Sequence, residues 1–193
     1  MTDPTAVDGA LGRVVEEHGA LDVVVCTPGV NVRKPIVDYT DEDFDRVVDV
    51  NLKGSFHVLR AAGRLMAPRR RGSIILFSSI RAQVVEPGQS VYASTKAGIV
   101  QFTKSCVPLH ESHGVRVNCV CPGPVQTPML ERGIKDSPDP ALTRRRTEQT
   151  TILGRLGQPG EIANVVYFLA SDEASFITGS AILADGGVTS KAT

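Results

Sequence analysis

This sequence lacks three features that mark specialised classes of protein: a charge imbalance, a long apolar run and cysteine pairs with CxxC spacing. Lys and Arg together number 21, and so do Asp and Glu, which argues against a broad surface for nucleic acid. No apolar run approaches membrane-spanning length, and the N-terminal segment has neither the basic nor the apolar stretch of a secretory signal. We therefore expect a cytoplasmic protein that binds neither nucleic acid nor membranes.

The cysteines show no CxxC spacing, and we interpret them as free thiols, mostly buried, in a reducing compartment. There are 4 of them: Cys26, Cys106, Cys119 and Cys121. His110 and His113 lie close to the last two in the sequence, so a zinc site is the alternative. Surface histidines and core cysteines are the favoured interpretation, and we predict no metal.

The length and the composition fit one globular domain. The chain has 193 residues, of which 41% are hydrophobic and 22% are charged, so composition gives no reason to expect disorder. We predict a single domain over residues 1–193.

Short apolar runs alternate with longer amphipathic segments along the chain. The apolar runs predict strands at 21–26, 73–78, 115–121 and 181–184, and the first of them has the continuous apolar character of a strand buried on both faces. Helices are predicted near the N-terminus, over 40–71 and 92–112, and from Pro159 onward. Such alternation indicates an α/β fold with a parallel sheet between helices.

Two segments interrupt this pattern. Residues 128–150 are rich in proline and charge, which predicts a mobile helical excursion beside the substrate. Pro108 lies inside the helix predicted over 92–112, where a missing N–H and a ring clash favour a kink.

Tyr92 and Lys96 are one helical turn apart, so their side chains share a face. A phenol normally loses its proton near pH 10, and a nearby ammonium lowers that pKa by favouring the phenolate. The pair can therefore make tyrosine a general acid/base. Surface neighbours often have this spacing by chance, so the pair needs support from other residues.

Three further positions supply that support. Ser79 follows the strand at 73–78, where ligands of open α/β sheets bind. Pro122 and Gly123 follow the next strand and reach the same edge. Asn51 interrupts the apolar stripe of the helix over 40–71, where a buried amide needs polar partners.

The sequence that carries Asn51, Ser79, Tyr92 and Lys96 in this order resembles the short-chain dehydrogenases/reductases. The blocks that match, in family order, are NLKGSFHV (51–58), SIILFSSI (73–80), VYASTKAGI (91–99), VRVNCVCPGPVQTPM (115–129) and the long segment 154–187. The resemblance implies a Rossmann-like, doubly wound parallel sheet.

The resemblance also implies roles for single residues. Tyr92 would exchange the proton with the substrate oxygen, Ser79 would orient that oxygen, and Lys96 would lower the Tyr92 pKa and hold the nicotinamide ribose. Asn51 would fix a water that relays protons. The implied cofactor is NAD or NADP, whose nicotinamide side would contact Gly29, Pro122, Gly123, Val125 and Thr127. Ile80, Arg81, Val84 and Val85 would shape the substrate pocket together with residues 128–150.

The sequence departs from the family where a glycine-rich turn normally follows the first strand. The triplet Gly154, Gly157 and Gly160 follows a polar loop and is interpreted as a turn before the helix at Pro159. We therefore expect a partial Rossmann-like domain that lacks its first two βα units, has a weakened pyrophosphate site and leaves the strand at 21–26 as an apolar edge.

Two functions follow from this sequence. The first is an NAD(P)-dependent oxidoreductase that interconverts a secondary alcohol and a ketone, a small-molecule substrate, with Tyr92 as the acid/base. The second is a truncated, non-catalytic oligomerisation or interaction module. In both cases the helices over 40–71 and 92–112 resemble those that pair subunits in the family, which implies a homo-oligomer, dimer or tetramer. The substrate, the direction of the reaction and the choice between NAD and NADP stay open.

Overall fold

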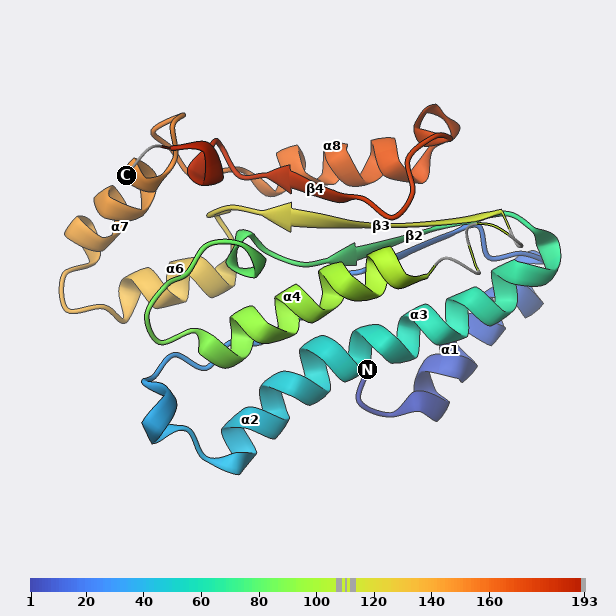
Figure 1. Cartoon of the computed structure of the whole chain (residues 1–193), viewed down its shortest axis with the longest axis horizontal. Coiled ribbons are helices and arrows are strands. Elements are labelled where there is room, and N and C mark those ends of the chain that lie inside the picture. The colour runs from blue at the N-terminus through green and yellow to red at the C-terminus, as the bar shows by residue number, and fades with distance from the viewer. Residues whose placement is uncertain (107–108, 110, 112–113, 192–193) are drawn as a thin grey trace.

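The computed structural model describes residues 1–106, 109, 111 and 114–191. At its centre lies a sheet of four parallel strands in the order β1-β2-β3-β4 (Figure 1). The strands are β1 (Val23–Cys26), β2 (Gly72–Phe77), β3 (Val115–Pro122) and β4 (Ala181–Ala184). All four are parallel and lie within two residues of the predicted strand boundaries, which confirms the α/β fold class.

Helices cover both faces of this sheet (Figure 1). One face packs against α1 (Pro4–His18), α3 (Gly54–Met66) and α4 (Ser90–Ser105), and the other against α8 (Pro159–Ala170). Ile74 and Leu76 of β2 belong to the larger apolar cluster beneath α3 and α4, whereas Ile75 belongs to the smaller cluster beneath α8. Because successive side chains of a strand point to opposite faces, β2 is apolar at consecutive positions.

The prediction that the first strand is buried on both faces is wrong. Val24 and Cys26 are buried, but Val23 is 40% and Val25 is 42% exposed. Within the described residues, β1 pairs with β2 alone and therefore forms an edge of the sheet. Helix α8 packs on β2 and β3, so the second face of β1 has no such cover.

The helix predicted over 40–71 is divided by an irregular turn. Helix α2 (Asp41–Val48) begins at Thr40, which forms a capping box with Asp43. A π-helical turn over Asp49–Lys53 follows, then α3, and a short 3₁₀ turn over Ala67–Arg69 ends the segment. Such widened turns often occur at functional sites, and this one contains Asn51.

Helix α4 begins two residues before the predicted start and ends at Ser105, earlier than predicted. Pro108, His110 and His113, on which the predicted kink and the zinc alternative depend, lie outside the described residues. All four cysteines are free thiols, and Cys106 is the one that is only half-buried. Within the described part of the chain, no group of three or more His, Cys, Asp or Glu side chains could hold a metal ion.

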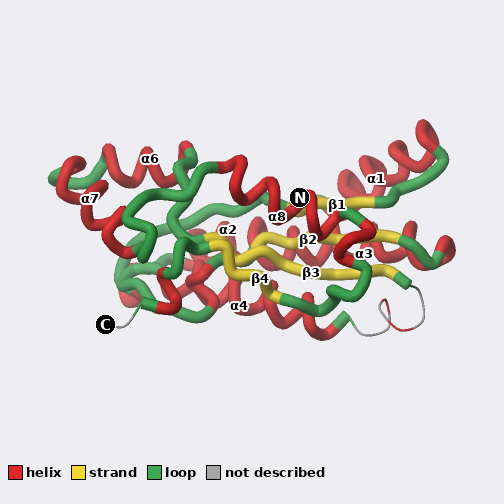
Figure 2. The backbone as a smooth tube through the Cα atoms, turned by 90° about the horizontal axis from the view of Figure 1, so that it is seen from above, coloured by secondary structure: helices red, strands yellow, loops and turns green. Residues whose placement is uncertain are grey.

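The segment 128–150 folds into two helices, α6 (Pro128–Lys135) and α7 (Pro140–Thr150). An ion pair between Glu131 and Arg144 joins them. Both helices lie at the end of the molecule toward which the strands point, far from α1 (Figure 2). Short 3₁₀ turns also occur over Ile36–Asp38, Ile80–Ala82, Asp172–Ala174 and Val188–Ser190. None of the helices that can be described has the length and apolar character to cross a bilayer.

The unequal faces of the sheet give a test in two matched substitutions. Val117 of β3 is fully buried, whereas Val25 of β1 is 42% exposed. Val117→Thr places a hydroxyl among apolar side chains and is expected to lower the free energy of unfolding by roughly 1–3 kcal/mol. Val25→Thr is expected to change it by no more than about 0.5 kcal/mol. Urea unfolding followed by circular dichroism measures both, and equal losses would contradict the assignment of β1 as an edge.

Candidate active site

The predicted site residues gather at the carboxyl ends of the strands. Gly29 follows β1, Ser79 follows β2, and Pro122 ends β3. Tyr92 lies in the first turn of α4, which packs against the same ends of β2 and β3. This is the edge at which open α/β sheets bind ligands.

The Ser79 hydroxyl lies near the Tyr92 phenol and acts on its pKa as a hydrogen-bonding group. Ser79 also caps the 3₁₀ turn that follows it, because its Oγ accepts a hydrogen bond of 3.1 Å from the Arg81 N–H. Burial raises the pKa of Tyr92 above its ordinary value, and the Ser79 hydrogen bond and the Arg81 charge partly oppose that rise. The phenol is therefore protonated at neutral pH.

Lys96 is almost fully buried, with 3% of its surface exposed. Its Nζ donates a hydrogen bond of 2.8 Å to the Phe77 carbonyl and lies 5.6 Å from the centre of the Tyr92 ring. Burial lowers the Lys96 pKa to about 8, so the ammonium loses its proton before the Tyr92 phenol does. The lowering of the Tyr92 pKa by Lys96, which the resemblance implies, stays a prediction; in the structure Ser79 and the Arg81 charge oppose part of the rise that burial causes.

Three buried thiols surround Lys96. Those of Cys26, Cys119 and Cys121 are close enough that their charge would favour the Lys96 ammonium. Cys119 and Cys121 are two residues apart in β3 and face the same side of the sheet, in the same apolar cluster. The interaction between the two buried thiols lowers the pKa of Cys121 and raises that of Cys119.

Asn51 is fully buried, and its amide holds the loop that follows β1. Its Oδ1 accepts a hydrogen bond of 2.8 Å from the Val30 N–H. Its Nδ2 donates to the Val30 carbonyl at 2.9 Å and to Thr95 Oγ1 at 3.2 Å. Both N–H groups are in use, which leaves one lone pair of Oδ1 for a further donor such as water.

Gly29 lies between Asn51 and Lys96. A Cβ atom at this position would come within 3.3 Å of Lys96 Nζ and 3.7 Å of Asn51 Oδ1. A side chain here would therefore press on the buried ammonium group. Glycine at this position allows the loop after β1 to approach Lys96 closely.

The predicted nicotinamide contacts lie along the chain after β3. Gly123 packs so closely on the backbone of Asp185 that a Cβ would lie 2.7 Å from its Cα. Val125 pairs with Gly157 in an isolated parallel bridge. Thr127 begins α6, and its Oγ1 accepts a hydrogen bond of 3.4 Å from the Leu130 N–H. The segment is thus fixed at both ends.

The residues present fit the two halves of a dinucleotide differently. The nicotinamide end would meet Gly29, Lys96, Tyr92 and the loop after β3, which lie together at the carboxyl ends of the strands. No glycine-rich turn between a strand and a helix, which would bind the pyrophosphate, is found within the described residues. Gly157 and Gly160 instead bracket the start of α8, as predicted for a simple turn.

Comparison with known proteins assigns the family. A family model described as enoyl-(acyl carrier protein) reductase matches residues 1–189. The 3-oxoacyl-[acyl-carrier-protein] reductase FabG of Thermotoga maritima is 38% identical over 188 residues, which cover 97% of this chain and 74% of the relative. The chain belongs to the short-chain dehydrogenase/reductase family.

Two other members of the short-chain dehydrogenase/reductase family bear on its chemistry. The cyclopentanol dehydrogenase of Comamonas testosteroni is 38% identical over 181 residues, covering 94% of this chain and 71% of the relative. A crystal structure of a gluconate 5-dehydrogenase from Burkholderia cenocepacia, in complex with NADP and tartrate, superposes with a TM-score of 0.91. It is 30% identical, and the match covers 99% of this chain and 73% of that one.

Sequence reasoning missed several polar residues of this short-chain dehydrogenase/reductase site. Ser78 Oγ donates a hydrogen bond of 2.8 Å to the Lys96 carbonyl and ties the end of β2 to α4. Asn31, Arg33, Glu86 and Gln89 link the loops after β1 and β2. No local pattern identifies the pairs Asn31–Gln89 and Arg33–Glu86, because the members of each pair are more than 50 residues apart.

The buried Lys96 predicts a dependence of stability on pH. Its pKa is lowered from 10.5 to about 8, so between these values the folded chain binds fewer protons than the unfolded chain, and stability rises with pH. The lysine accounts for a rise on the order of 3 kcal/mol across this window.

Urea unfolding at a series of pH values from 8 to 10.5 tests this expectation on Lys96→Met. The rise attributed to Lys96 should be absent from this variant. Lys104→Met is the matched control, because Lys104 is an exposed residue of the same helix. Identical pH profiles for the wild type and Lys96→Met would contradict the assignment.

Proposed function

We propose that this protein is an NAD(P)-dependent oxidoreductase that interconverts a secondary alcohol and a ketone, with Tyr92 as the general acid/base. The observation that carries the proposal is the meeting of Tyr92 and buried Lys96 of α4 with Ser79 at the carboxyl end of β2, fixed by the hydrogen bonds of Ser78 and Lys96 across this contact. Membership of the family and the cyclopentanol and gluconate dehydrogenases among its relatives support the reaction class.

Each site residue has a distinct task in this proposal. Ser79 Oγ donates a hydrogen bond to the substrate oxygen, and Tyr92 gives that oxygen a proton in reduction or removes one in oxidation. The raised Tyr92 pKa keeps the phenol protonated near neutral pH, which suits proton donation to a carbonyl. Asn51 holds Val30, and through it the loop that carries Gly29, and keeps one oxygen lone pair for a relay water.

The cofactor supplies the hydride when it is bound. Lys96 and Tyr92 would hold its nicotinamide ribose, and Gly29, Pro122, Gly123, Val125 and Thr127 would line the nicotinamide pocket. The NADP in the related gluconate 5-dehydrogenase supports the nicotinamide class without selecting between NAD and NADP. Residues 128–150, folded as α6 and α7, form one side of the substrate pocket and limit its access to water.

Replacement of the acid/base tests this function. Tyr92→Phe removes the hydroxyl while keeping the ring, and we expect kcat to fall by roughly 10²–10⁴-fold. Oxidation of cyclopentanol, followed by the absorbance of the reduced nicotinamide with NAD and with NADP in separate assays, is the measurement. Tyr167→Phe is the control, because Tyr167 is 78% exposed on α8. Unchanged turnover in Tyr92→Phe would exclude Tyr92 as the acid/base.

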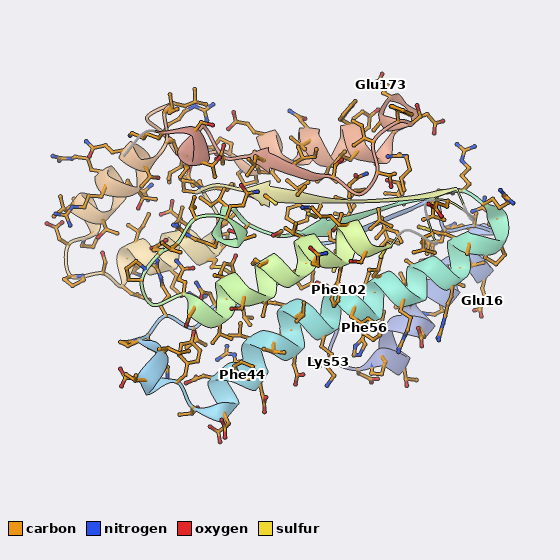
Figure 3. The ribbon with its side chains drawn as sticks, viewed as in Figure 1. Glu16, Phe44, Lys53, Phe56, Phe102 and Glu173 are labelled. Atoms are coloured by element: carbon orange, nitrogen blue, oxygen red, sulfur yellow. The ribbon has the colours of Figure 1, made fainter. Side chains whose placement is uncertain are left out.

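The protein also presents an aromatic face that suits self-association. Phe44 of α2 and Phe56 of α3 are 48% and 41% exposed. Phe56 contacts Phe102 of α4 with ring centres 6.4 Å apart (Figure 3), and the Arg60 guanidinium lies 5.1 Å from the Phe56 ring centre. Exposed aromatic groups of this kind are typical of interfaces, so a second copy of the chain covers this face in a homo-oligomer.

Size-exclusion chromatography with light scattering tests this interface. Phe56→Glu places a charge at the centre of the face and is expected to shift a dimer or tetramer toward a smaller species. Val85→Glu, at a residue that is 94% exposed in the loop after β2, should leave the mass unchanged. An oligomer that persists in Phe56→Glu would contradict the assignment of this face.

A further inference from the structure

The loops that follow β1 and β2 are joined side by side next to the site. The Lys34 N–H donates a hydrogen bond of 3.2 Å to the Gly88 carbonyl. Asn31 Nδ2 donates one of 2.9 Å to Oε1 of the buried Gln89. In Figure 1 both loops lie at the end of the sheet where α4 begins. The two segments therefore form one continuous surface beside Tyr92.

Two arginines on this surface share a single carboxylate. Glu86 Oε1 pairs with Arg33, and Glu86 Oε2 pairs with Arg81. We call Arg33 and Arg81 the arginine pair. Within the described residues, Glu86 is the only carboxylate at ion-pair distance from either guanidinium. The neighbouring Lys34 is itself paired with Asp43. Arg33, Arg81 and Glu86 together therefore carry one net positive charge.

The arginine pair keeps hydrogen-bond donors for a further partner. A guanidinium has five N–H groups in a flat fork, and one carboxylate oxygen occupies only part of each fork. Arg81 also donates to the Val85 carbonyl at 3.5 Å. Both side chains reach solvent, since that of Arg81 is 23% exposed and that of Arg33 is 53% exposed. A planar anion can therefore approach both arginines.

Arg81 lies in the 3₁₀ turn that packs against α4, the helix that carries Tyr92. Its backbone N–H donates to Ser79 Oγ at 3.1 Å, so Arg81 is held beside the residue that would bind the substrate oxygen. The Arg81 charge also favours the Tyr92 phenolate. An anion on the arginine pair would thus belong to the same small molecule as that oxygen.

We propose that the arginine pair binds a carboxylate group of the substrate, so that the protein acts on hydroxy acids and oxo acids rather than on uncharged alcohols. This inference rests on the proposed function and names the substrate class of the same site. Guanidinium groups suit a carboxylate because both are planar and can form two parallel hydrogen bonds. Glu86 pairs with both guanidinium groups and offsets the repulsion between their positive charges.

A matched pair of substrates measures the charge preference. 3-Hydroxybutyrate and its methyl ester have the same secondary alcohol but differ in the negative charge. We expect kcat/KM for the acid, divided by that for the ester, to fall roughly 10- to 100-fold in Arg81→Gln, as the loss of a charged hydrogen bond implies. Arg81→Lys should lose part of this ratio, because it keeps the charge without the fork.

Arg71→Gln is the control, because Arg71 directly precedes β2, at the amino ends of the strands and away from the site, and is largely exposed. Its ratio should match that of the wild type. A ratio that is unchanged in Arg81→Gln would overturn the inference. If both substrates were still turned over, the proposed oxidoreductase function would stand although the carboxylate site had failed. Loss of the inference and loss of the proposed function are therefore distinguishable.

A binding measurement gives a readout that does not need turnover. Malonate should raise the melting temperature of the wild type and of Arg71→Gln, and this rise should be lost in Arg81→Gln and reduced in Arg33→Gln. Malonamide, the uncharged analogue, should have no effect on any variant. An equal effect of malonate on all variants, or none on the wild type, would contradict a carboxylate site at the arginine pair.

Discussion

Two buried hydrogen bonds join the carboxyl end of β2 to α4, and the positions of the candidate catalytic side chains depend on them. Ser78 Oγ donates to the Lys96 carbonyl, and Lys96 Nζ donates to the Phe77 carbonyl. Together they fix both the rotation and the height of α4 relative to the strand. Tyr92 is one turn earlier on the same helix face, so this contact brings the phenol to Ser79. A shift of one residue in either bond would move the phenol out of reach of Ser79.

A second constraint connects this contact to the loop after β1. The π-helical turn between α2 and α3 contains Asn51, whose amide binds both backbone polar groups of Val30 and also Thr95 of α4. One buried side chain thus ties together a helix, a loop and the catalytic helix. Because a buried amide without partners is costly, the arrangement favours a single conformation of the loop that carries Gly29.

Burial also determines the charges of the site. Burial lowers the pKa of Lys96, although the three nearby thiols act in the opposite direction. Burial of Tyr92 raises the pKa of its phenol. The Arg81 charge opposes part of that rise, and Arg81 is itself paired with Glu86. In the proposed site, acid/base chemistry and carboxylate recognition would therefore share Arg81.

The sequence by itself determined the elements and the spacing within them. Helical geometry alone puts Tyr92 and Lys96 on one face, and the end of an apolar run puts Ser79 at the edge of a sheet, because both patterns are local. The structure decided what depends on contacts between distant segments. The half-exposed state of β1, the hydrogen bond of Lys96 to Phe77 and the sharing of Glu86 by Arg33 and Arg81 have no local signature. Each follows from which segments meet in space, and burial and pKa follow from that meeting rather than from periodicity.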